Sequence, residues 1–361
     1  MKIGIEGFPF QKQPSGIGKY IQSLVCLLIE KYPDAEFFIY SNRPVFLPEK
    51  IVQRVRVVED KSIFKHLNPN VWLKTVAGYI IAKDNLDFYF SGAGILPLLS
   101  NRIKKVMVVH DLNYKIVPHT MGRLLLLSQY VFLKNDVQKA NFLIVNSKGT
   151  AEKVKQYLGK EADTILNPPT DSSRYKKMSE SETHDVLIKH HINYPYFLTV
   201  GTLEPRKNLQ MTIDVFIRFL ERAENKDFKL VVVGSSGWRD KKIIEQCDNY
   251  KNNIVRLGYV DENDLPAFYN GAVAFLFPSI YEGFGMPARE ALYCGCQVIA
   301  SDIVELRESC KGNALFIHSN APGDYLKALQ LATKNTGNVS SVSFEKVESD
   351  TSSFLNFFVT T

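Results

Sequence analysis

The most informative stretch of the 361-residue sequence reads Pro278-Ser279-Ile280-Tyr281-Glu282-Gly283-Phe284-Gly285-Met286-Pro287-Ala288-Arg289-Glu290-Ala291-Leu292-Tyr293-Cys294-Gly295-Cys296-Gln297-Val298-Ile299-Ala300-Ser301-Asp302. The apolar run that leads into it, residues 273–278, predicts a strand buried on both faces. Pro287 suits the first turn of a helix, and Gly295 suits the end of that helix. A further strand is expected over residues 297–301. The order of strand, glycine turn, helix and strand is typical of a parallel α/β sheet.

Two glutamates bracket the glycine turn of this stretch. Gly283 and Gly285 flank Phe284 and allow the backbone to approach a ligand, while the free N–H groups of a helix start can bind phosphate or sugar hydroxyls. Glu282 and Glu290 add carboxylates, which accept hydrogen bonds from hydroxyl groups. The pattern therefore indicates a site for a polyhydroxylated ligand. The alternative is an ordinary turn with two solvated glutamates, but ligands collect at such strand ends.

Strand-like and helix-like runs alternate along the whole chain, which indicates doubly wound parallel sheets. In the first half we expect strands at residues 2–6, 37–40, 55–59, 88–91, 106–111, 142–147 and 164–167, and helices at 17–31, 69–84, 121–140 and 147–158. In the second half we expect strands at residues 197–201, 229–234, 254–260, 273–278, 297–301 and 314–317.

The two halves are separated by a polar stretch, residues 171–183, which follows Pro168-Pro169 and is expected to be a linker. The sequence thus predicts one Rossmann-like domain over residues 1–170 and a second over 171–343. Apolar positions between Phe344 and Phe358 predict a last helix in a segment, residues 344–361, that can reach back to the first domain.

The bulk composition fits a globular protein of the cytoplasm. The chain is 45% hydrophobic, has no apolar run that could cross a bilayer, and begins directly with a strand and not with a signal peptide. Its 5 cysteines are odd in number and lie in apolar or mixed segments, which favours a reducing compartment. Cys294 and Cys296 have no partner pair at zinc spacing, so we interpret them as buried small residues and predict no metal site.

The positive charge is concentrated in the first half of the chain. Residues 1–170 hold 23 Lys and Arg against 14 Asp and Glu, a net +9, whereas the remainder has a net −3. Such asymmetry can indicate an anionic membrane surface or nucleic acid, and no other feature resembles a nucleic-acid module. The aromatic and basic segment Phe64 to Lys83 is the expected peripheral contact with the inner face of the cell membrane. An ordinary excess of surface lysine is the alternative.

Three further motifs occur at positions where ligands bind. Gly16 and Gly18 precede a long helix and can form a phosphate cradle or a simple turn, although Ile21 replaces the third glycine of the dinucleotide fingerprint. His110 follows a buried strand beside Asp111, where a capped core histidine is the alternative to a functional one. Arg206-Lys207 follows the first strand of the second half and can hold a phosphate or be a solvated basic pair.

Taken together, these residues resemble the GT-B glycosyltransferases of family 4. The resemblance rests on Ser15-Gly16-Ile17-Gly18-Lys19-Tyr20, His110-Asp111-Leu112, Glu204-Pro205-Arg206-Lys207-Asn208 and Tyr281-Glu282-Gly283-Phe284-Gly285-Met286-Pro287 with Glu290-Ala291-Leu292. These motifs keep the family's order and spacing from about residue 2 to residue 330. The resemblance implies two Rossmann-like domains facing a central cleft, with the acceptor on the first domain and the nucleotide sugar on the second.

The resemblance also implies a role for each motif residue. Glu290 would hold the ribose hydroxyls, and Arg206 and Lys207 would neutralise the diphosphate. Gly16 would offer its N–H group to the distal phosphate. The remaining site residues would surround the transferred sugar: Glu282 and the turn Gly283, Phe284 and Gly285 would hold it, and His110 would lie against its reacting face.

The resemblance implies sugar transfer without a metal ion. In keeping with this, the chain has no D-x-D motif of the kind that metal-dependent sugar transferases use. Cations and helix dipoles would stabilise the departing diphosphate. Two positions depart from the family pattern. Thr202 stands where an arginine is common, which removes one cation from the phosphate site, and Arg289 stands where a nonpolar residue is commoner.

We therefore expect a retaining hexosyltransferase that needs no cofactor beyond its nucleotide-sugar co-substrate. GDP-mannose is the expected donor and a lipid-linked oligosaccharide of bacterial surface polysaccharide, such as O-antigen in lipopolysaccharide, the expected acceptor, both on resemblance. The alternatives are a UDP-sugar transferase of the same fold, an inactive scaffold of a glycan assembly complex, and a nicotinamide dehydrogenase, which the missing dinucleotide fingerprint disfavours. The sequence leaves the acceptor, the linkage, the base and the oligomeric state open.

Overall fold

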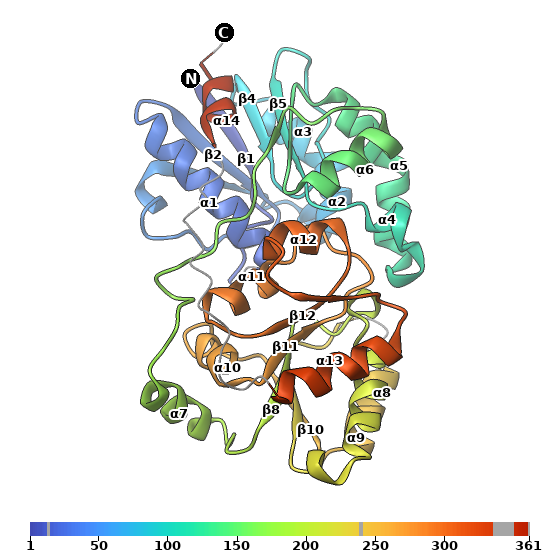
Figure 1. Cartoon of the computed structure of the whole chain (residues 1–361). Helices are drawn as coiled ribbons and strands as arrows, with labels where there is room; N and C mark the ends of the chain where they lie inside the picture. Colours follow the sequence, from blue (N-terminus) through green and yellow to red (C-terminus); the bar gives the residue numbers. More distant parts are fainter. Residues whose placement is uncertain (13–14, 238–240, 335–349, 360–361) are drawn as a thin grey trace. The chain divides into compact units, whose positions relative to one another are not determined.

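A computed structural model describes residues 1–12, 15–237, 241–334 and 350–359. The chain divides into two compact units (Figure 1). Unit 1 holds Met1–Lys115, Arg123–Pro169 and the C-terminal segment that carries α14. Unit 2 holds Ile116–Gly122 and the chain from Thr170 through α13. Each unit is built around its own parallel sheet.

The sheet of unit 1 has the order β3-β2-β1-β4-β5-β6-β7, and all its strand pairs are parallel. The strands are β1 (Lys2–Glu6), β2 (Glu36–Ser41), β3 (Val55–Glu59), β4 (Phe88–Ser91), β5 (Lys104–Val109), β6 (Phe142–Val145) and β7 (Thr164–Ile165). The strand order reverses direction between β1 and β4, so their carboxyl ends flank the crevice where sheets of this type bind ligands.

The helices of unit 1 cover its sheet, and the C-terminal helix completes the core. They are α1 (Gly16–Lys31), α2 (Pro69–Trp72), α3 (Gly78–Ile81), α4 (Asn113–Ile116, at the edge of the unit), α5 (Arg123–Lys139), α6 (Lys148–Leu158) and α14 (Ser352–Phe357). Phe354 and Phe358 are buried in the same apolar cluster as Ile3, Leu24 and Phe88. The helix expected between residues 344 and 358 is thus present from Ser352, while residues 344–349 lie outside the described residues.

The sheet of unit 2 has the order β10-β9-β8-β11-β12-β13 and is also parallel throughout. The strands are β8 (Tyr196–Val200), β9 (Lys229–Val233), β10 (Ile254–Gly258), β11 (Ala274–Phe277), β12 (Val298–Ser301) and β13 (Leu315–Ile317). Neighbouring residues of one strand join different clusters: Phe275 packs on one face and Leu276 on the other. Burial on both faces is why these strands read as continuous apolar runs.

The helices of unit 2 are α7 (Glu180–Lys189), α8 (Leu209–Leu220), α9 (Lys241–Asn249), α10 (Leu265–Gly271), α11 (Met286–Tyr293), α12 (Val304–Cys310) and α13 (Pro322–Lys334). The expectation of a linker up to residue 183 is wrong at its C-terminal end, because α7 begins at Glu180. Ser179 and Glu182 form a reciprocal capping box that starts this helix. None of the helices in the described part of the chain is long and apolar enough to span a bilayer.

Candidate functional site

In unit 2, two loops meet where the strand order changes direction between β8 and β11. Residues 201–208 follow β8, and residues 278–285 follow β11. The backbone N–H of Ile280 donates to the carbonyl of Arg206 at 2.8 Å, and Nη1 of Arg206 donates to the carbonyl of Tyr281 at 3.1 Å. The two motifs identified separately in the sequence therefore form one surface at the carboxyl edge of the sheet.

Four charged side chains form a compact cluster across these two loops. Oε1 of Glu282 lies 2.6 Å from Nζ of Lys207, and its Oε2 lies 2.7 Å from Nη1 of Arg206. Nη2 of Arg206 also lies 2.7 Å from Oε1 of Glu204. Each of these side chains is no more than 17% exposed. Glu204 begins the Glu-Pro-Arg-Lys-Asn motif, but nothing in the sequence alone indicates that it pairs with Arg206.

The cluster holds Glu282 in its ionised form. Burial pushes the pKa of Glu282 up, but the charges of Arg206 and Lys207 outweigh it and lower the pKa to about 2. Burial lowers the pKa of Lys207, and the charge of Glu282 opposes that change. Burial raises the pKa of Glu204 despite the neighbouring cations. The site thus combines two mutually close cations with a fixed carboxylate, which suits a ligand that carries both phosphate and hydroxyl groups.

A shallow hollow adjoins Lys207 at the ends of β8, β9 and β11. Gly201, Thr202 and Phe277 are among the residues that line it. Nζ of Lys207 lies 4.5 Å from the centre of the Phe277 ring, a cation–π contact that orients the ammonium group. Thr202 is exposed and lines this hollow beside Lys207, so an arginine in its place would add a second cation there.

The glycine turn before α11 has a backbone conformation that requires glycine at one position. Gly285 has φ = +97°, and a Cβ atom there would lie 2.3 Å from Cδ2 of Leu306. Arg289 is buried, donates from Nε to the carbonyl of Ser309 at 3.0 Å, and lies 4.2 Å from the Phe284 ring centre. Arg289 therefore supports the turn and the packing of α11 on α12, which accounts for its departure from a nonpolar residue.

Glu290 lies on α11 in different surroundings from those of Glu282. Its Oε2 accepts a hydrogen bond from the Tyr269 hydroxyl at 3.2 Å, and the Tyr269 ring packs edge-on against Tyr175. Glu290 is partly exposed, so its carboxylate can also reach a ligand. The two glutamates that bracket the turn thus differ in environment, as different roles would require.

In unit 1, Gly16 and His110 lie at the ends of neighbouring elements. Gly16 is the first residue of α1, which Ser15 caps by accepting from the N–H of Gly18 at 3.3 Å. The N–H of Gly16 therefore belongs to the first turn, where helical N–H groups have no intrahelical acceptor. His110 directly follows β5, and it lines a hollow together with Ile17.

The His110 ring is buried and oriented by one strong contact. Its Nε2 lies 2.6 Å from the Gly92 carbonyl, whereas its buried Nδ1 has no hydrogen-bond partner among the described residues. Burial lowers the pKa of His110, against the effects of the Gly92 carbonyl and Asp111. A neutral imidazole that donates from Nε2 keeps Nδ1 as an acceptor. The structure brings Arg206, Lys207 and Glu282 together in unit 2, and a joint role with Gly16 and His110 stays a prediction.

Comparisons with known proteins find similarity to glycosyltransferases. Residues 183–343 match the family model of glycosyl transferases group 1. The chain is 29% identical over 331 residues to O-antigen chain mannosyltransferase B of Escherichia coli, covering 85% of this chain and 84% of the relative. It is 25% identical over 335 residues to O-antigen chain mannosyltransferase RfbU of Salmonella typhimurium, covering 89% and 87%. The solved structure of WaaG, a glycosyltransferase involved in lipopolysaccharide biosynthesis, superimposes with a TM-score of 0.71, at 16% identity over 93% of this chain and 91% of WaaG.

These comparisons confirm the GT-B fold of two parallel-sheet α/β domains. They also confirm the resemblance to O-antigen mannosyltransferases and support a glycosyltransferase. Every site residue predicted for the second half of the chain lies inside the matched family segment. These residues are Arg206, Lys207, Glu282, Gly283, Phe284, Gly285 and Glu290.

Proposed function

We propose that the chain is a retaining hexosyltransferase that moves mannose from GDP-mannose to a hydroxyl group of a lipid-linked oligosaccharide in bacterial surface polysaccharide synthesis. The observation that carries the proposal is the contact of Arg206 and Lys207 with Glu282 at the edge of the unit 2 sheet. Cations for a diphosphate and a carboxylate for sugar hydroxyls are adjacent there, as a nucleotide sugar requires. Mannose is favoured because the two relatives that align over most of the chain are named as mannosyltransferases.

In the proposed reaction the residues of unit 2 bind and polarise the donor. Lys207 and Arg206 neutralise charge that develops on the departing diphosphate, and the N–H groups at the start of α11 add a favourable dipole. Glu282 accepts hydrogen bonds from hydroxyls of the transferred sugar, and Glu290 accepts them from the ribose. These protein charges can perform the stabilisation that a metal ion supplies elsewhere.

In the proposal, unit 1 also contributes two residues, His110 and Gly16, that contact the donor. His110 would lie against the transferred sugar, and its Nδ1 is an acceptor for a sugar hydroxyl. Gly16 would donate its N–H to the distal phosphate at the start of α1. The role of His110 is binding and orientation, because its pKa is lowered and its ring is held by the Gly92 carbonyl.

A screen of nucleotide sugars tests the proposal. The purified protein is incubated with GDP-mannose, UDP-glucose, UDP-galactose or UDP-N-acetylglucosamine, with and without a chelator, and the released nucleotide is quantified. We expect the fastest hydrolysis of GDP-mannose to GDP and mannose, unaffected by chelation, with α-mannose as the first-formed anomer by NMR. Preference for a UDP sugar would favour the alternative donor class. No turnover, with cellular glycan unchanged by Lys207→Ala and Glu282→Ala, would favour the scaffold.

We further propose a peripheral contact of unit 1 with an anionic membrane. In the predicted segment, Phe64 is 47% and Tyr79 is 74% exposed, close in sequence to Lys65 and Lys83. On α5, Leu124, Leu127 and Val131 are exposed at helical spacing and lie between Arg123 and Lys134. Exposed apolar side chains flanked by cations are typical of surfaces that bind anionic lipid.

Liposome cosedimentation tests this contact with neutral vesicles and with vesicles that contain anionic lipid. We expect binding to the anionic vesicles only, weakened by salt and by Leu124→Asp with Leu127→Asp. A matched control is Leu331→Asp, since Leu331 is 51% exposed on α13 of unit 2. Equal binding to both kinds of vesicle would remove the electrostatic part of this proposal.

A further inference from the structure

Unit 1 has a buried carboxyl group where its strand order reverses. Glu6 is the last residue of β1 and is 2% exposed. Its Oε2 accepts hydrogen bonds from the N–H of Ala93 at 2.8 Å and from Oγ of Ser91 at 3.1 Å. Ser91 is the last residue of β4, and Ala93 lies in the bend that follows it, residues 92–94. Glu6 thus ties the carboxyl end of β1 to this segment, which we call the β4 bend.

The β4 bend also carries the group that orients the His110 ring. The carbonyl oxygen of Gly92 lies 2.6 Å from Nε2 of His110, and Gly92 lies between the two residues that bind Glu6. A Cβ atom at Gly92 would lie 2.6 Å from Cγ2 of Ile21, so the bend packs closely against α1. The position of the Gly92 carbonyl therefore depends on two supports, the packing on α1 and the hydrogen bonds to Glu6.

The hydrogen bond to Gly92 is the contact that fixes the state of the imidazole. The Tyr20 ring meets the His110 ring edge-on, with 5.8 Å between the ring centres, and this contact does not select a tautomer. Nδ1 of His110 is buried and has no hydrogen-bond partner among the described residues. The partner of one ring nitrogen decides which nitrogen carries the proton. The Gly92 carbonyl therefore keeps the proton on Nε2 and leaves Nδ1 as an acceptor.

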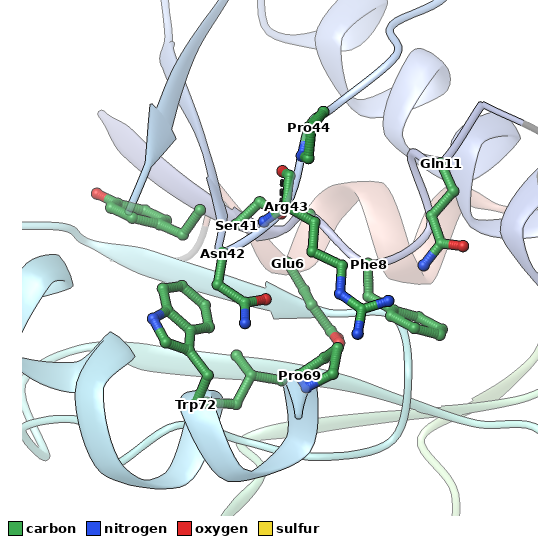
Figure 2. Close-up of a pocket in the computed structure, with 12 residues that line it drawn as sticks. Glu6, Phe8, Gln11, Ser41, Asn42, Arg43, Pro44, Pro69 and Trp72 are labelled. Atoms are coloured by element: carbon green, nitrogen blue, oxygen red, sulfur yellow. Dashed lines mark hydrogen bonds between the residues drawn. The ribbon is translucent and has the colours of Figure 1, made fainter. Parts of the chain in front are cut away.

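Glu6 itself has no room to bind a substrate. Figure 2 shows its side chain among those of Phe8, Arg43 and Pro69, which line a hollow at the carboxyl ends of β1 and β2. This hollow has room for about one water molecule, which is too little for a sugar ring. The second carboxyl oxygen, Oε1, is buried as well. Any effect of Glu6 on a bound sugar must therefore pass through the β4 bend.

We propose that Glu6 is a positioning residue for His110. Its carboxyl group fixes the β4 bend, the bend fixes the carbonyl of Gly92, and this carbonyl orients the imidazole. The inference rests on the proposed function for the sugar that His110 contacts, whereas the orientation of the ring does not require any donor. A ring that is ordered in advance costs less to order when a sugar binds. A displacement of about 1 Å in such a group can slow a reaction about 100-fold.

Proton exchange at the His110 ring tests this link without any substrate. The full chain is prepared with isotope-labelled histidine, and His110→Gln identifies the NMR signal of His110 among those of the 7 histidines. In the wild type we expect a proton on Nε2 that exchanges slowly with water. Glu6→Ala should speed this exchange roughly tenfold or more, because the segment that carries the acceptor loosens. Glu6→Gln keeps an oxygen that can accept from Ala93, so its exchange should stay close to that of the wild type.

Hydrolysis of the donor that the screen selects tests the consequence for the reaction. Glu6→Ala should lower the turnover number roughly tenfold or more. The affinity for the free nucleotide should be unchanged, because the nucleotide has no sugar for His110 to contact. When Glu6→Ala is added to His110→Ala, the further loss should be less than about twofold. A residue that acts through another has no separate effect once that other residue is removed.

A matched control separates this role from a general loss of stability. Asp60 is another buried carboxylate of unit 1, 6% exposed, and it accepts hydrogen bonds from Trp72 and Ser62 in a different segment. Asp60→Ala should destabilise unit 1 but leave the proton exchange and the turnover number close to those of the wild type. Glu6→Asp withdraws the carboxyl group by one methylene group and should speed the exchange as well. It tests the same contact should Glu6→Ala fail to fold.

The inference would be overturned if the His110 proton exchanged equally fast in the wild type, Glu6→Ala and Glu6→Asp. It would also be overturned if Glu6→Ala slowed hydrolysis as strongly in His110→Ala as in the wild type. A third contrary result would be an Asp60→Ala protein that matched Glu6→Ala in both measurements. Absence of hydrolysis by the wild-type protein would overturn the proposed function, whereas the exchange result would stand on its own.

Discussion

The ammonium nitrogen of Lys207 lies 2.6 Å from Oε1 of Glu282, although the two residues are 75 positions apart in the sequence. The resemblance gives them different tasks, one at the diphosphate and the other at the transferred sugar. Because they share an ion pair, a change in either residue alters the charge of the other's surroundings. Their partner Arg206 couples the pair to Glu204 as well.

Lys207→Met should weaken the binding of the nucleoside diphosphate that the donor screen selects by at least tenfold. The variant loses the ammonium group and leaves Arg206 as the remaining partner of Glu282. Isothermal titration calorimetry measures the affinity. Lys226→Met is the matched control, because Lys226 is exposed in the same unit and distant in sequence from the site. Equal affinities of the two variants would contradict a role of Lys207 at the diphosphate.

Glu290→Ala should mainly weaken nucleotide binding, and Glu282→Ala should mainly slow transfer. Glu290 lies on α11 beside Tyr269, whereas Glu282 lies at the cationic cluster, so under the proposed function the two changes would affect different parts of the donor. The dissociation constant of the free nucleotide and the turnover number are measured for both variants. If both variants lowered nucleotide affinity by the same factor, the division of roles would be wrong.

Gly285→Ala should destabilise unit 2 more than Gly295→Ala does. Both glycines have positive φ, +97° and +75°, which costs an alanine roughly 1–2 kcal/mol. Only at Gly285 would the new methyl group also collide with Leu306, at 2.3 Å, whereas it would meet no atom within 4 Å at Gly295. Urea unfolding monitored by fluorescence compares the variants. Equal losses would show that Leu306 moves aside at little cost.

Phe354→Ala should destabilise unit 1 by about 3–5 kcal/mol, the usual cost of removing a buried phenylalanine side chain. Phe354 is 0% exposed in the core that contains Phe90. Val359→Ala, at a side chain that is 60% exposed, is the control and should cost less than about 0.5 kcal/mol. A Phe354→Ala protein as stable as the control would show that α14 contributes little to the fold.

Glu6→Gln should change how the stability of unit 1 depends on pH. Burial raises the pKa of Glu6 to about 7, against the hydrogen bonds from Ala93 and Ser91. The folded state therefore holds a proton that the unfolded state has lost, so the wild type loses stability as pH rises from about 4.5 to about 7. By linkage this loss is on the order of 3 kcal/mol, and Glu6→Gln avoids it.

Urea unfolding of both proteins at pH 5 and pH 8 measures this difference. The free energy of unfolding of Glu6→Gln, relative to that of the wild type, should be higher at pH 8 than at pH 5. Tyr89, whose own pKa is raised by burial and by the charge of Glu6, stays neutral over this range and contributes no titration. If the two proteins differed in unfolding free energy by the same amount at both pH values, Glu6 would be ionised in the folded protein throughout this range.

Much of the fold could be predicted because the strands are buried on both faces. Such strands read as apolar runs, so residues 274–277 and 298–301 were expected within one or two positions of their observed ends. The start of α7 was missed because its capping box lies in a polar stretch that also reads as a linker. The contacts of Glu6 with Ser91 and Ala93 could not be predicted, because a single acidic residue at a strand end has no distinguishing pattern.

The sequence by itself determined the alternation of elements, the glycine turn before α11 and the residue types that can bind a nucleotide sugar. These features depend on local backbone conformation and on burial, and both can be read from the pattern of apolar and polar residues within a short stretch of sequence. Only the tertiary structure decided which of these residues touch. The order of parallel strands places the end of β8 beside that of β11 and the end of β1 beside that of β4. That order brings Lys207 to Glu282, and Glu6 to Ser91, because contacts across a sheet depend on strand pairing and not on distance along the chain.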